Sequence, residues 1–251
     1  MTDFTAARLN MIESQVRPNG ITDRRIIAAM ERIPRELFVP ESRRAVAYMD
    51  EDVPLEPASG QPRALIESMA FARMLQHAAV KPTDKLLIIG AGTGYGAAVT
   101  ASLAAATVAL ECDPGLATDA RRNLEGTANV KLVEGPLEAG VPAARARAAA
   151  GRPTLRGRGK VRLRKVPLQA GVPADAPYDV IVAEGRVEEV PQALIDQLAD
   201  GGRLVAVVGE ADMAQAVVHT RSGTAIAVRQ VFDASIAALP GMKKKKPAFV
   251  F

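Results

Sequence analysis

Four glycines at alternate positions follow an apolar run in LLIIGAGTGYGAAV, residues 86–99. A strand that ends in glycines and leads into a helix brings backbone N–H groups close to a polar ligand. A dinucleotide-binding fingerprint would use Gly92, Gly94 and Ala97. A loop for the methionine half of S-adenosylmethionine would start at Gly90, and a plain glycine-rich turn is the third interpretation. We favour the S-adenosylmethionine loop because Gly90 stands directly at the end of the expected strand.

Two acidic residues end the next two expected strands. Glu111 follows TVAL about 20 residues after the glycines, where a carboxylate accepts both hydroxyls of an adenosine ribose. This placement fits NAD equally well. Glu134 ends NVKLVE and either accepts from the adenine edge or is a solvated strand-end acid. Cys112 follows Glu111 and could lie near the adenine, although a small buried packing residue is the favoured interpretation.

The second half of the chain alternates short apolar strands with helices. Strands are expected at KLLIIG, TVALE, NVKLVE, YDVIVAE and RLVAVVG, with helices at DPGLATDARRNLEG and VPQALIDQLADGG and a helix from the glycines to about Ala105. Asp113 is the expected N-cap of its helix and Pro114 the first helical residue. Continuous apolar strands predict a mostly parallel sheet covered on both faces, an α/β Rossmann-like fold. QAVVHT-RSG-TAIAVRQVF predicts an antiparallel C-terminal hairpin, which dinucleotide folds usually lack.

The N-terminal third has a helical pattern. Thr22 can cap a helix through ITDRRIIAAMERI that Pro34 ends, and a second helix is expected from about Leu65 to Ala79. We expect residues 1–80 to form a helical cap on the substrate side. Residues 81–251 are then the cofactor-binding domain.

A basic stretch interrupts this second domain. NVKLVEGPLEAGVPA (129–143) is echoed 31 residues later by KVRLRKVPLQAGVPA (160–174), so a duplication inserted at about 143–173 is expected to form an exposed basic arm. Removing its nine basic residues changes the formal net charge from +4 to −5. The arm could bind phosphates of RNA or an acidic protein, but it has no aromatic residue for base stacking. An insertion without a selected role is the favoured interpretation.

The composition excludes several other classes of protein. The single cysteine excludes an internal disulfide framework and cysteine-based zinc sites. With only His77 and His219, no metal site is expected, and both histidines are interpreted as structural or surface residues. The first residues lack the apolar centre of a secretory signal, and the most apolar run is too short to span a bilayer. We expect a cytoplasmic protein without membrane contact.

Four segments together resemble the protein-L-isoaspartate O-methyltransferase family, over most of the chain outside the arm. AYMDEDVPL (47–55) resembles the family's Y-x-D-x-x-L-P, and IIGAGTGYGAAV resembles its I-G-x-G-x-G-Y-x-A-A-V. LVEGPLEAGVP resembles G-D-G-x-x-G-x-P, and APYDVIVAEGRVEEVPQALIDQLADGGRLVAVVG resembles the family's long A-P-Y-D to L-V-x-x-V-G run. The resemblance implies a class I methyltransferase fold and S-adenosylmethionine as cofactor. It implies cofactor contacts from Gly90, Ala91, Gly92, Thr93, Gly94, Tyr95, Glu111, Cys112, Glu134 and Gly135.

This chain departs from the family pattern at three places. The family has an acid two positions before the first glycine, and this acid is implied to hold the cofactor's amino group through water. In this chain Ile88 stands at that position. The active-site serine of G-Q-T-I-S-Q-P aligns with Ala64 or Ile66, and neither carries a hydroxyl. Ser59 and Ser68 lie nearby, although a loop serine and a helix-surface serine are the favoured interpretations. Glu134 replaces the aspartate of G-D-G.

The resemblance implies repair methylation of the α-carboxylate of L-isoaspartyl residues in damaged proteins. Such a carboxylate is already a nucleophile at neutral pH, so the enzyme must supply alignment and exclusion of water, and no catalytic residue is assigned. Because the serine loop is rewritten, two alternatives stay open. One keeps the cofactor and changes the methyl acceptor, and the other is a catalytically degenerate module that binds nucleic acid or protein through the arm.

Overall fold

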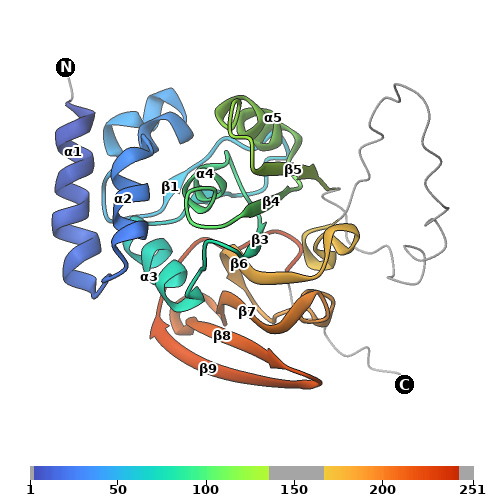
Figure 1. Cartoon of the computed structure of the whole chain (residues 1–251). Helices are drawn as coiled ribbons and strands as arrows, with labels where there is room; N and C mark the ends of the chain where they lie inside the picture. Colours follow the sequence, from blue (N-terminus) through green and yellow to red (C-terminus); the bar gives the residue numbers. More distant parts are fainter. Residues whose placement is uncertain (1–2, 136–166, 243–251) are drawn as a thin grey trace.

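The computed structural model describes residues 3–135 and 167–242, apart from the side chain of Asp212. Within these residues the chain forms a seven-stranded sheet of order β5-β4-β3-β6-β7-β8-β9 (Figure 1). The strands are β3 Lys85–Ile89, β4 Ala106–Glu111, β5 Val130–Glu134, β6 Tyr178–Val187, β7 Leu198–Val208, β8 Gln215–Ser222 and β9 Ala225–Asp233. β5, β4, β3, β6 and β7 pair in parallel, and β8 and β9 are antiparallel. The expected α/β fold with a C-terminal hairpin is confirmed.

The central strands are apolar throughout because both faces of the sheet are covered. Leu86 and Ile88 of β3 belong to one hydrophobic cluster, whereas Leu87 and Ile89 belong to the other. The first cluster contains the N-terminal helices together with α3 Ser68–Ala78, α4 Tyr95–Thr100 and α5 Pro114–Asn123. The second contains α7 Gln192–Ile195, the 3-10 turn Leu168–Ala170 and the segment around Leu239. Side chains alternate between the faces of a strand, so continuous apolar runs give two buried faces.

The N-terminal region packs against the same face of the sheet. It consists of α1 Phe4–Met11, α2 Arg24–Arg32 and 3-10 turns at Arg35–Phe38 and Glu41–Val46, followed by the two-residue strands β1 Val53–Pro54 and β2 Ala64–Leu65. α2 begins one residue later than expected. Asp23, not Thr22, is its N-cap, because the Asp23 carboxylate accepts from the Arg25 N–H at 2.9 Å.

Three expected helices are shorter in the structure. Leu65 lies in β2, where it pairs with Val53, so α3 starts at Ser68. α4 ends at Thr100, whose hydroxyl donates back to the Gly96 carbonyl. The expected helix VPQALIDQLADGG is wrong beyond Ile195, because LADGG opens β7, which pairs with β6 through a shifted register.

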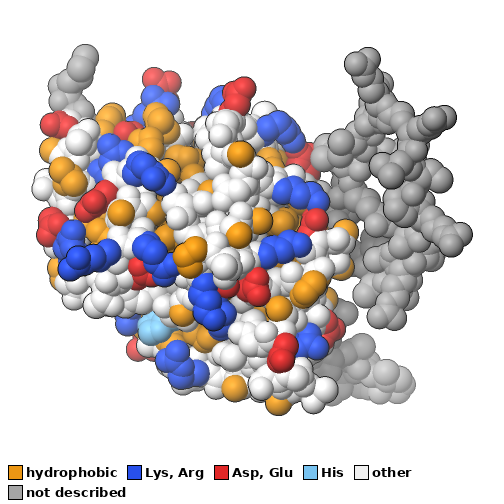
Figure 2. All heavy atoms as spheres, in the orientation of Figure 1, with side chains coloured by type: hydrophobic (Ala, Val, Ile, Leu, Met, Phe, Trp, Pro, Cys, Tyr) orange, Lys and Arg blue, Asp and Glu red, His pale blue; other side chains and the backbone are white. Residues whose placement is uncertain are grey.

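Several expectations fall outside the described residues. They include most of the basic insertion and the first copy's GPLEAGVPA beyond Gly135, as well as the lysine run 243–246 with AFVF after it. On the face shown in Figure 2, basic and acidic side chains are interspersed over the described surface. None of the described helices is both long enough and apolar enough to cross a bilayer.

Candidate functional site

The carboxyl ends of four adjacent strands form one row. Glu134 of β5 pairs with Glu111 of β4, and Ile89 of β3 pairs with both Leu110 and Ala183. The next residues along are therefore Gly90, after β3, and Glu184 on β6. The row thus contains Glu134, Glu111, the glycine loop and Glu184, in that order. Ligands of open α/β sheets bind at this edge.

The glycine loop requires backbone conformations that side chains disfavour. Gly90, Gly92 and Gly94 have φ values of +76°, +56° and +97°. A Cβ at Gly90 would lie 2.5 Å from Leu239 Cδ2, and one at Gly94 would lie 3.0 Å from Leu124 Cδ1. The N–H groups of Gly90 and Ala91 donate to the Leu110 carbonyl. The loop is thus held closely over the end of β3.

Glu111 is fully buried at the centre of the row. Its carboxylate accepts from the backbone N–H groups of Gly92 at 2.7 Å, Cys112 at 2.7 Å and Asp113 at 2.8 Å. These bonds fix both oxygens against the glycine loop. The residue expected to hold a ribose is therefore preorganised at the end of β4.

Arg63 forms a buried bidentate ion pair with this same carboxylate. Its guanidinium donates to Glu111 at 2.7 and 2.8 Å and to the Gly90 carbonyl at 3.0 Å. Burial alone would lower the pKa of Arg63, but the adjacent Glu111 charge outweighs burial and raises it. A carboxylate offers about four lone-pair positions, and here it already has five donors. No pattern in the sequence predicted this role of Arg63, which lies in the loop that departs from the family.

Asp113 joins that loop to the sheet edge. As expected, it caps α5, since its carboxylate accepts from Gly115 and Leu116 N–H groups. It also accepts from the backbone N–H groups of Ala58 at 3.0 Å and Ser59 at 2.8 Å. Residues 58–63 are therefore tied down beside Glu111.

The residues expected near an adenine surround the end of β5. Glu134 is partly buried and forms an ion pair with Arg121. The Gly135 N–H donates to the Glu111 carbonyl at 2.8 Å. Cys112 is buried, and burial raises the pKa of its thiol to about 12, so the thiol is protonated at neutral pH.

Thr93 and Tyr95 support the loop from behind with their side chains. The Thr93 hydroxyl donates to the Phe38 carbonyl, and the Asn123 amide donates to the Thr93 carbonyl at 3.0 Å. Tyr95 is buried, with its ring 5.5 Å from that of Phe38 and the Arg35 guanidinium 5.1 Å from its centroid. Both side chains therefore pack toward the N-terminal region and hold the loop in place.

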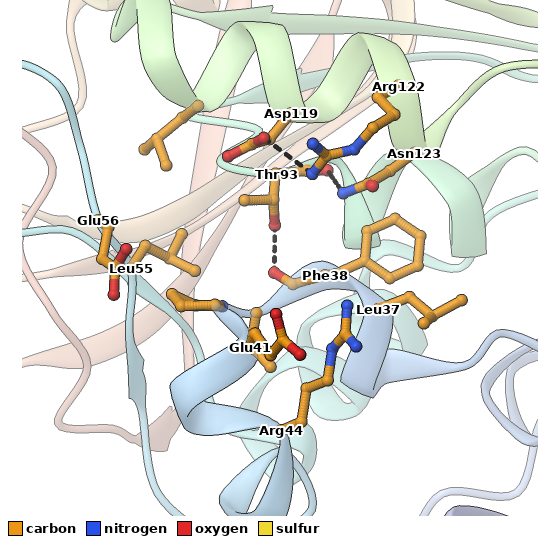
Figure 3. Close-up of a pocket in the computed structure, with 13 residues that line it drawn as sticks. Leu37, Phe38, Glu41, Arg44, Leu55, Glu56, Thr93, Asp119, Arg122 and Asn123 are labelled. Carbon is orange, nitrogen blue, oxygen red and sulfur yellow. Dashed lines mark hydrogen bonds and ion pairs between the residues drawn. The ribbon is translucent and has the colours of Figure 1, made fainter.

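A cavity of about 480 Å³ lies on the outer side of the glycine loop (Figure 3). It is bounded by the 3-10 turns of the N-terminal region and by α5, and its charged lining residues are Glu41, Arg44, Glu56, Asp119 and Arg122. Thr93 lines it, whereas Glu111 and Glu184 do not. This cavity is therefore separate from the row of strand ends.

The chain is similar to known proteins over most of its length. The sequence model of the family described as protein-L-isoaspartate(D-aspartate) O-methyltransferase matches residues 7–239. The chain belongs to this family. A protein-L-isoaspartate O-methyltransferase of Methanoculleus marisnigri is 37% identical over 80% of this chain and 77% of its own length. One from Koribacter versatilis is 32% identical over 99% of this chain and 97% of its own.

Solved structures show the same fold. A protein-L-isoaspartate O-methyltransferase structure matches with a TM-score of 0.71 at 22% identity, covering 94% of this chain and 67% of the other. A Plasmodium falciparum protein solved with S-adenosyl-L-homocysteine matches with a TM-score of 0.67 at 16% identity, covering 96% and 100%. The fold of the chain thus agrees with the family that the sequence comparisons show, the protein-L-isoaspartate O-methyltransferases.

The residues present fit this cofactor. The loop around Gly90 has no room for side chains, and Glu111 stands at the strand end where a ribose is held. Glu184 is buried nearby, and its Oε1 has no hydrogen-bond partner among the described residues. A buried orphan carboxylate oxygen at a ligand-binding edge indicates a missing donor.

The position of the family's serine carries no hydroxyl in this chain. Ala64 lies in β2, and Ile66 is buried with its carbonyl accepting from Arg35. Ser59 accepts from the Gln61 N–H. The expectation that Ser68 is a helix-surface residue is wrong, since it is fully buried at the start of α3.

The remaining candidates lie away from the row. The His77 ring stacks on Phe232, and His219 lies in β8. The described residues contain no group of three or more histidine, cysteine or acidic side chains that could hold a metal ion. Ile88 is fully buried in the core, so the acid expected of the family two positions before the first glycine is absent from β3.

Proposed function

We propose that the protein transfers a methyl group from S-adenosylmethionine to the α-carboxylate of L-isoaspartyl residues in damaged proteins. The observation that supports this most directly is the row from Glu134 through Glu111 to Gly90, in a chain of this family. The acceptor would be a protein or peptide in the cytoplasm.

The proposed contacts follow the order of the strands. The backbone of residues 90–95 cradles the methionine half, the Glu111 carboxylate accepts from the ribose hydroxyls, and Glu134 with Gly135 and Cys112 borders the adenine. Thr93 and Tyr95 hold the loop through Phe38 and Arg35, as described above. For Glu111 to accept from a ribose, Arg63 must give up part of its ion pair, because the carboxylate already has five donors.

The chemistry requires little from acidic or basic side chains. The bound cofactor supplies a methyl group on a positively charged sulfur, and the acceptor carboxylate is ionised at neutral pH. The protein must hold the acceptor in line and keep water out. Asp113 serves this by holding residues 58–59 beside the edge, and Leu239 by covering Gly90.

The acceptor side is proposed to come from residues 1–80, and the rewritten loop makes its specificity the open question. Asp52 joins this side to the C-terminal part of the chain, since it accepts from Glu67 N–H at 2.8 Å and from Ala237 N–H at 2.6 Å. Because Ala64 and Ile66 offer no hydroxyl, methylation of a different acceptor is the second candidate function.

Calorimetric titration with S-adenosylmethionine and S-adenosylhomocysteine tests the cofactor site. Gly92→Ala should weaken binding, because Gly92 has a φ of +56° and donates its N–H to Glu111. Gly126→Ala is the matched control, with a φ of +82° and open space around its Cα. Equal effects of both variants on affinity would refute the placement of the cofactor on this loop.

A methylation assay then identifies the acceptor. An isoaspartyl peptide and the same peptide with ordinary aspartate are compared with radiolabelled cofactor. Methylation of the isoaspartyl peptide alone supports the proposed function. Cofactor binding without methylation of either peptide would favour the second candidate.

A further inference from the structure

Glu184 is a buried acid that the proposed contacts do not use. It lies within β6 beside the end of β3, next along the row after Gly90, and its side chain packs against Gly96 of α4. A Cβ at Gly96 would lie 1.4 Å from Glu184 Oε1, so the glycine leaves the space that this carboxylate fills. Glu184 is only 6% exposed, and its Oε1 has no partner among the described residues.

The order of the strands places Glu184 at one end of the cofactor. Adenine is proposed at β5, ribose at β4 and the methionine half over the loop after β3, so the chain of the cofactor next reaches β6. Two strand spacings, about 10 Å, separate the ends of β4 and β6. The α-ammonium stands at the far end of that methionine half.

This chain lacks the acid that its family has at the corresponding part of the loop. Position 88 on β3 is isoleucine, whose side chain belongs to the hydrophobic core. Ile88 pairs directly with Val182, two residues before Glu184 on the neighbouring strand. The acidic residue that β3 lacks therefore has a counterpart on β6.

We propose that Glu184 accepts a hydrogen bond from the α-ammonium group of the bound cofactor and replaces the acid lost at position 88. Burial without a cationic partner is costly for a carboxylate, and an ammonium supplies both the charge and the donors that it lacks. The inference rests on the cofactor placement proposed above.

The free protein keeps this carboxyl group largely protonated. Burial raises the pKa of Glu184 to about 8, the nearby Arg63 and Arg35 act to lower it, and Glu111 acts to raise it. Burial raises the pKa of the neighbouring Tyr95 hydroxyl, and the Glu184 charge acts in the same direction. At pH 7 a cofactor carrying an ammonium should therefore release a proton from Glu184 to the buffer as it binds.

The test compares two ligands that differ at the amino-acid end. S-adenosylhomocysteine carries the α-ammonium, whereas 5′-methylthioadenosine keeps adenine, ribose and sulfur without the amino acid. Both are titrated calorimetrically into the wild-type protein and into Glu184→Gln. Glu189→Gln is the matched control, because this residue is exposed beyond the same strand.

Glu184→Gln should weaken the binding of S-adenosylhomocysteine by about tenfold to a hundredfold, the range for a hydrogen bond between charged groups. It should leave 5′-methylthioadenosine unchanged, and Glu189→Gln should alter neither affinity. Proton release, measured in buffers of different ionisation enthalpy, should disappear in Glu184→Gln. Because glutamine cannot ionise, the thermal midpoint of the free variant should match or exceed that of the wild type at pH 8.

Loss of affinity for both ligands, or for neither, would overturn the assignment of Glu184. Failure of the wild-type protein to bind 5′-methylthioadenosine would instead refute the placement of adenine and ribose. The two failures are thus distinguished within one set of titrations.

Discussion

Replacing Arg63 with methionine tests whether the buried guanidinium competes with the cofactor for Glu111. The two side chains are 3% and 0% exposed and form two hydrogen bonds of 2.7 and 2.8 Å. Removing one partner of a buried pair leaves an uncompensated charge and costs about 3–5 kcal/mol. In a protein of this size each kcal/mol shifts the thermal midpoint by about 2–4 °C. The free Arg63→Met variant should therefore melt on the order of 10 °C below the wild type.

The same substitution should strengthen binding of 5′-methylthioadenosine. Its ribose hydroxyls would meet Glu111 without displacing a guanidinium, so about tenfold tighter binding is expected, the lower end for a charged hydrogen bond. Differential scanning calorimetry and isothermal titration on the same samples measure both effects. The bound ligand should raise the thermal midpoint of the variant by more than it raises that of the wild type.

Arg17→Met is the control for removing an arginine from an ion pair. Arg17 contacts Glu13 at 2.7 Å with both side chains largely exposed, so its loss should cost at most about 1 kcal/mol and leave affinity unchanged. If Arg63→Met binds 5′-methylthioadenosine more weakly than the wild type, Arg63 is part of the ribose site and the competition argument is wrong. An unchanged thermal midpoint would show that the ion pair does not stabilise the free protein.

Four further predictions concern neighbouring groups. Burial would raise the pKa of Asp113, but hydrogen bonds from Leu116 and residues 58–59 outweigh it and lower the pKa, so Asp113 stabilises the fold above its unfolded pKa near ~4. Acid titration of stability should show Asp113→Asn losing this contribution, and an unchanged acid limb would contradict it. The contribution of Glu184 to stability changes with pH in the opposite direction. Its pKa is raised to about 8, so between about pH 4 and 8 the folded state binds one more proton than the unfolded state. Stability therefore falls as pH rises through this range. Glu184→Gln should flatten that slope in urea melts. Gly96→Ala should weaken the binding of S-adenosylhomocysteine as Glu184→Gln does, since the new Cβ would lie 1.4 Å from Glu184 Oε1. An affinity equal to that of the wild type would refute this prediction. Tyr178→Phe should cost about 1–3 kcal/mol in the same melts, because the buried Tyr178 hydroxyl donates to the Val172 carbonyl at 2.9 Å.

Local signals in the sequence predicted the parts of the edge that depend on nearby residues. The φ requirements of Gly90, Gly92 and Gly94 are properties of the loop itself. Asp113 satisfies helix N–H groups two and three residues ahead, so its cap is readable from spacing. Glu111 and Glu134 could be aligned because both end apolar strands that pair in register.

Contacts between distant segments were not predictable in the same way. Arg63 lies 48 residues before Glu111, and no periodic pattern connects a loop arginine to a strand-end acid. The sequence LADGG was assigned to a helix end because glycine commonly follows one. In the structure Leu198 pairs with Tyr178, and tertiary pairing outweighs that local preference.

Glu184 shows why a motif read along the chain can miss a function that the fold retains. On β3, isoleucine stands at position 88, where the resemblance to the family implies an acid. In the sheet, Ile88 lies beside β6, and the edge at the end of that strand carries a buried carboxylate with an unpartnered oxygen. Such a group lowers stability at neutral pH, whereas an apolar residue there would not. A residue that lowers stability is best explained by what it binds, and the ligand expected at this edge carries the ammonium that Glu184 lacks.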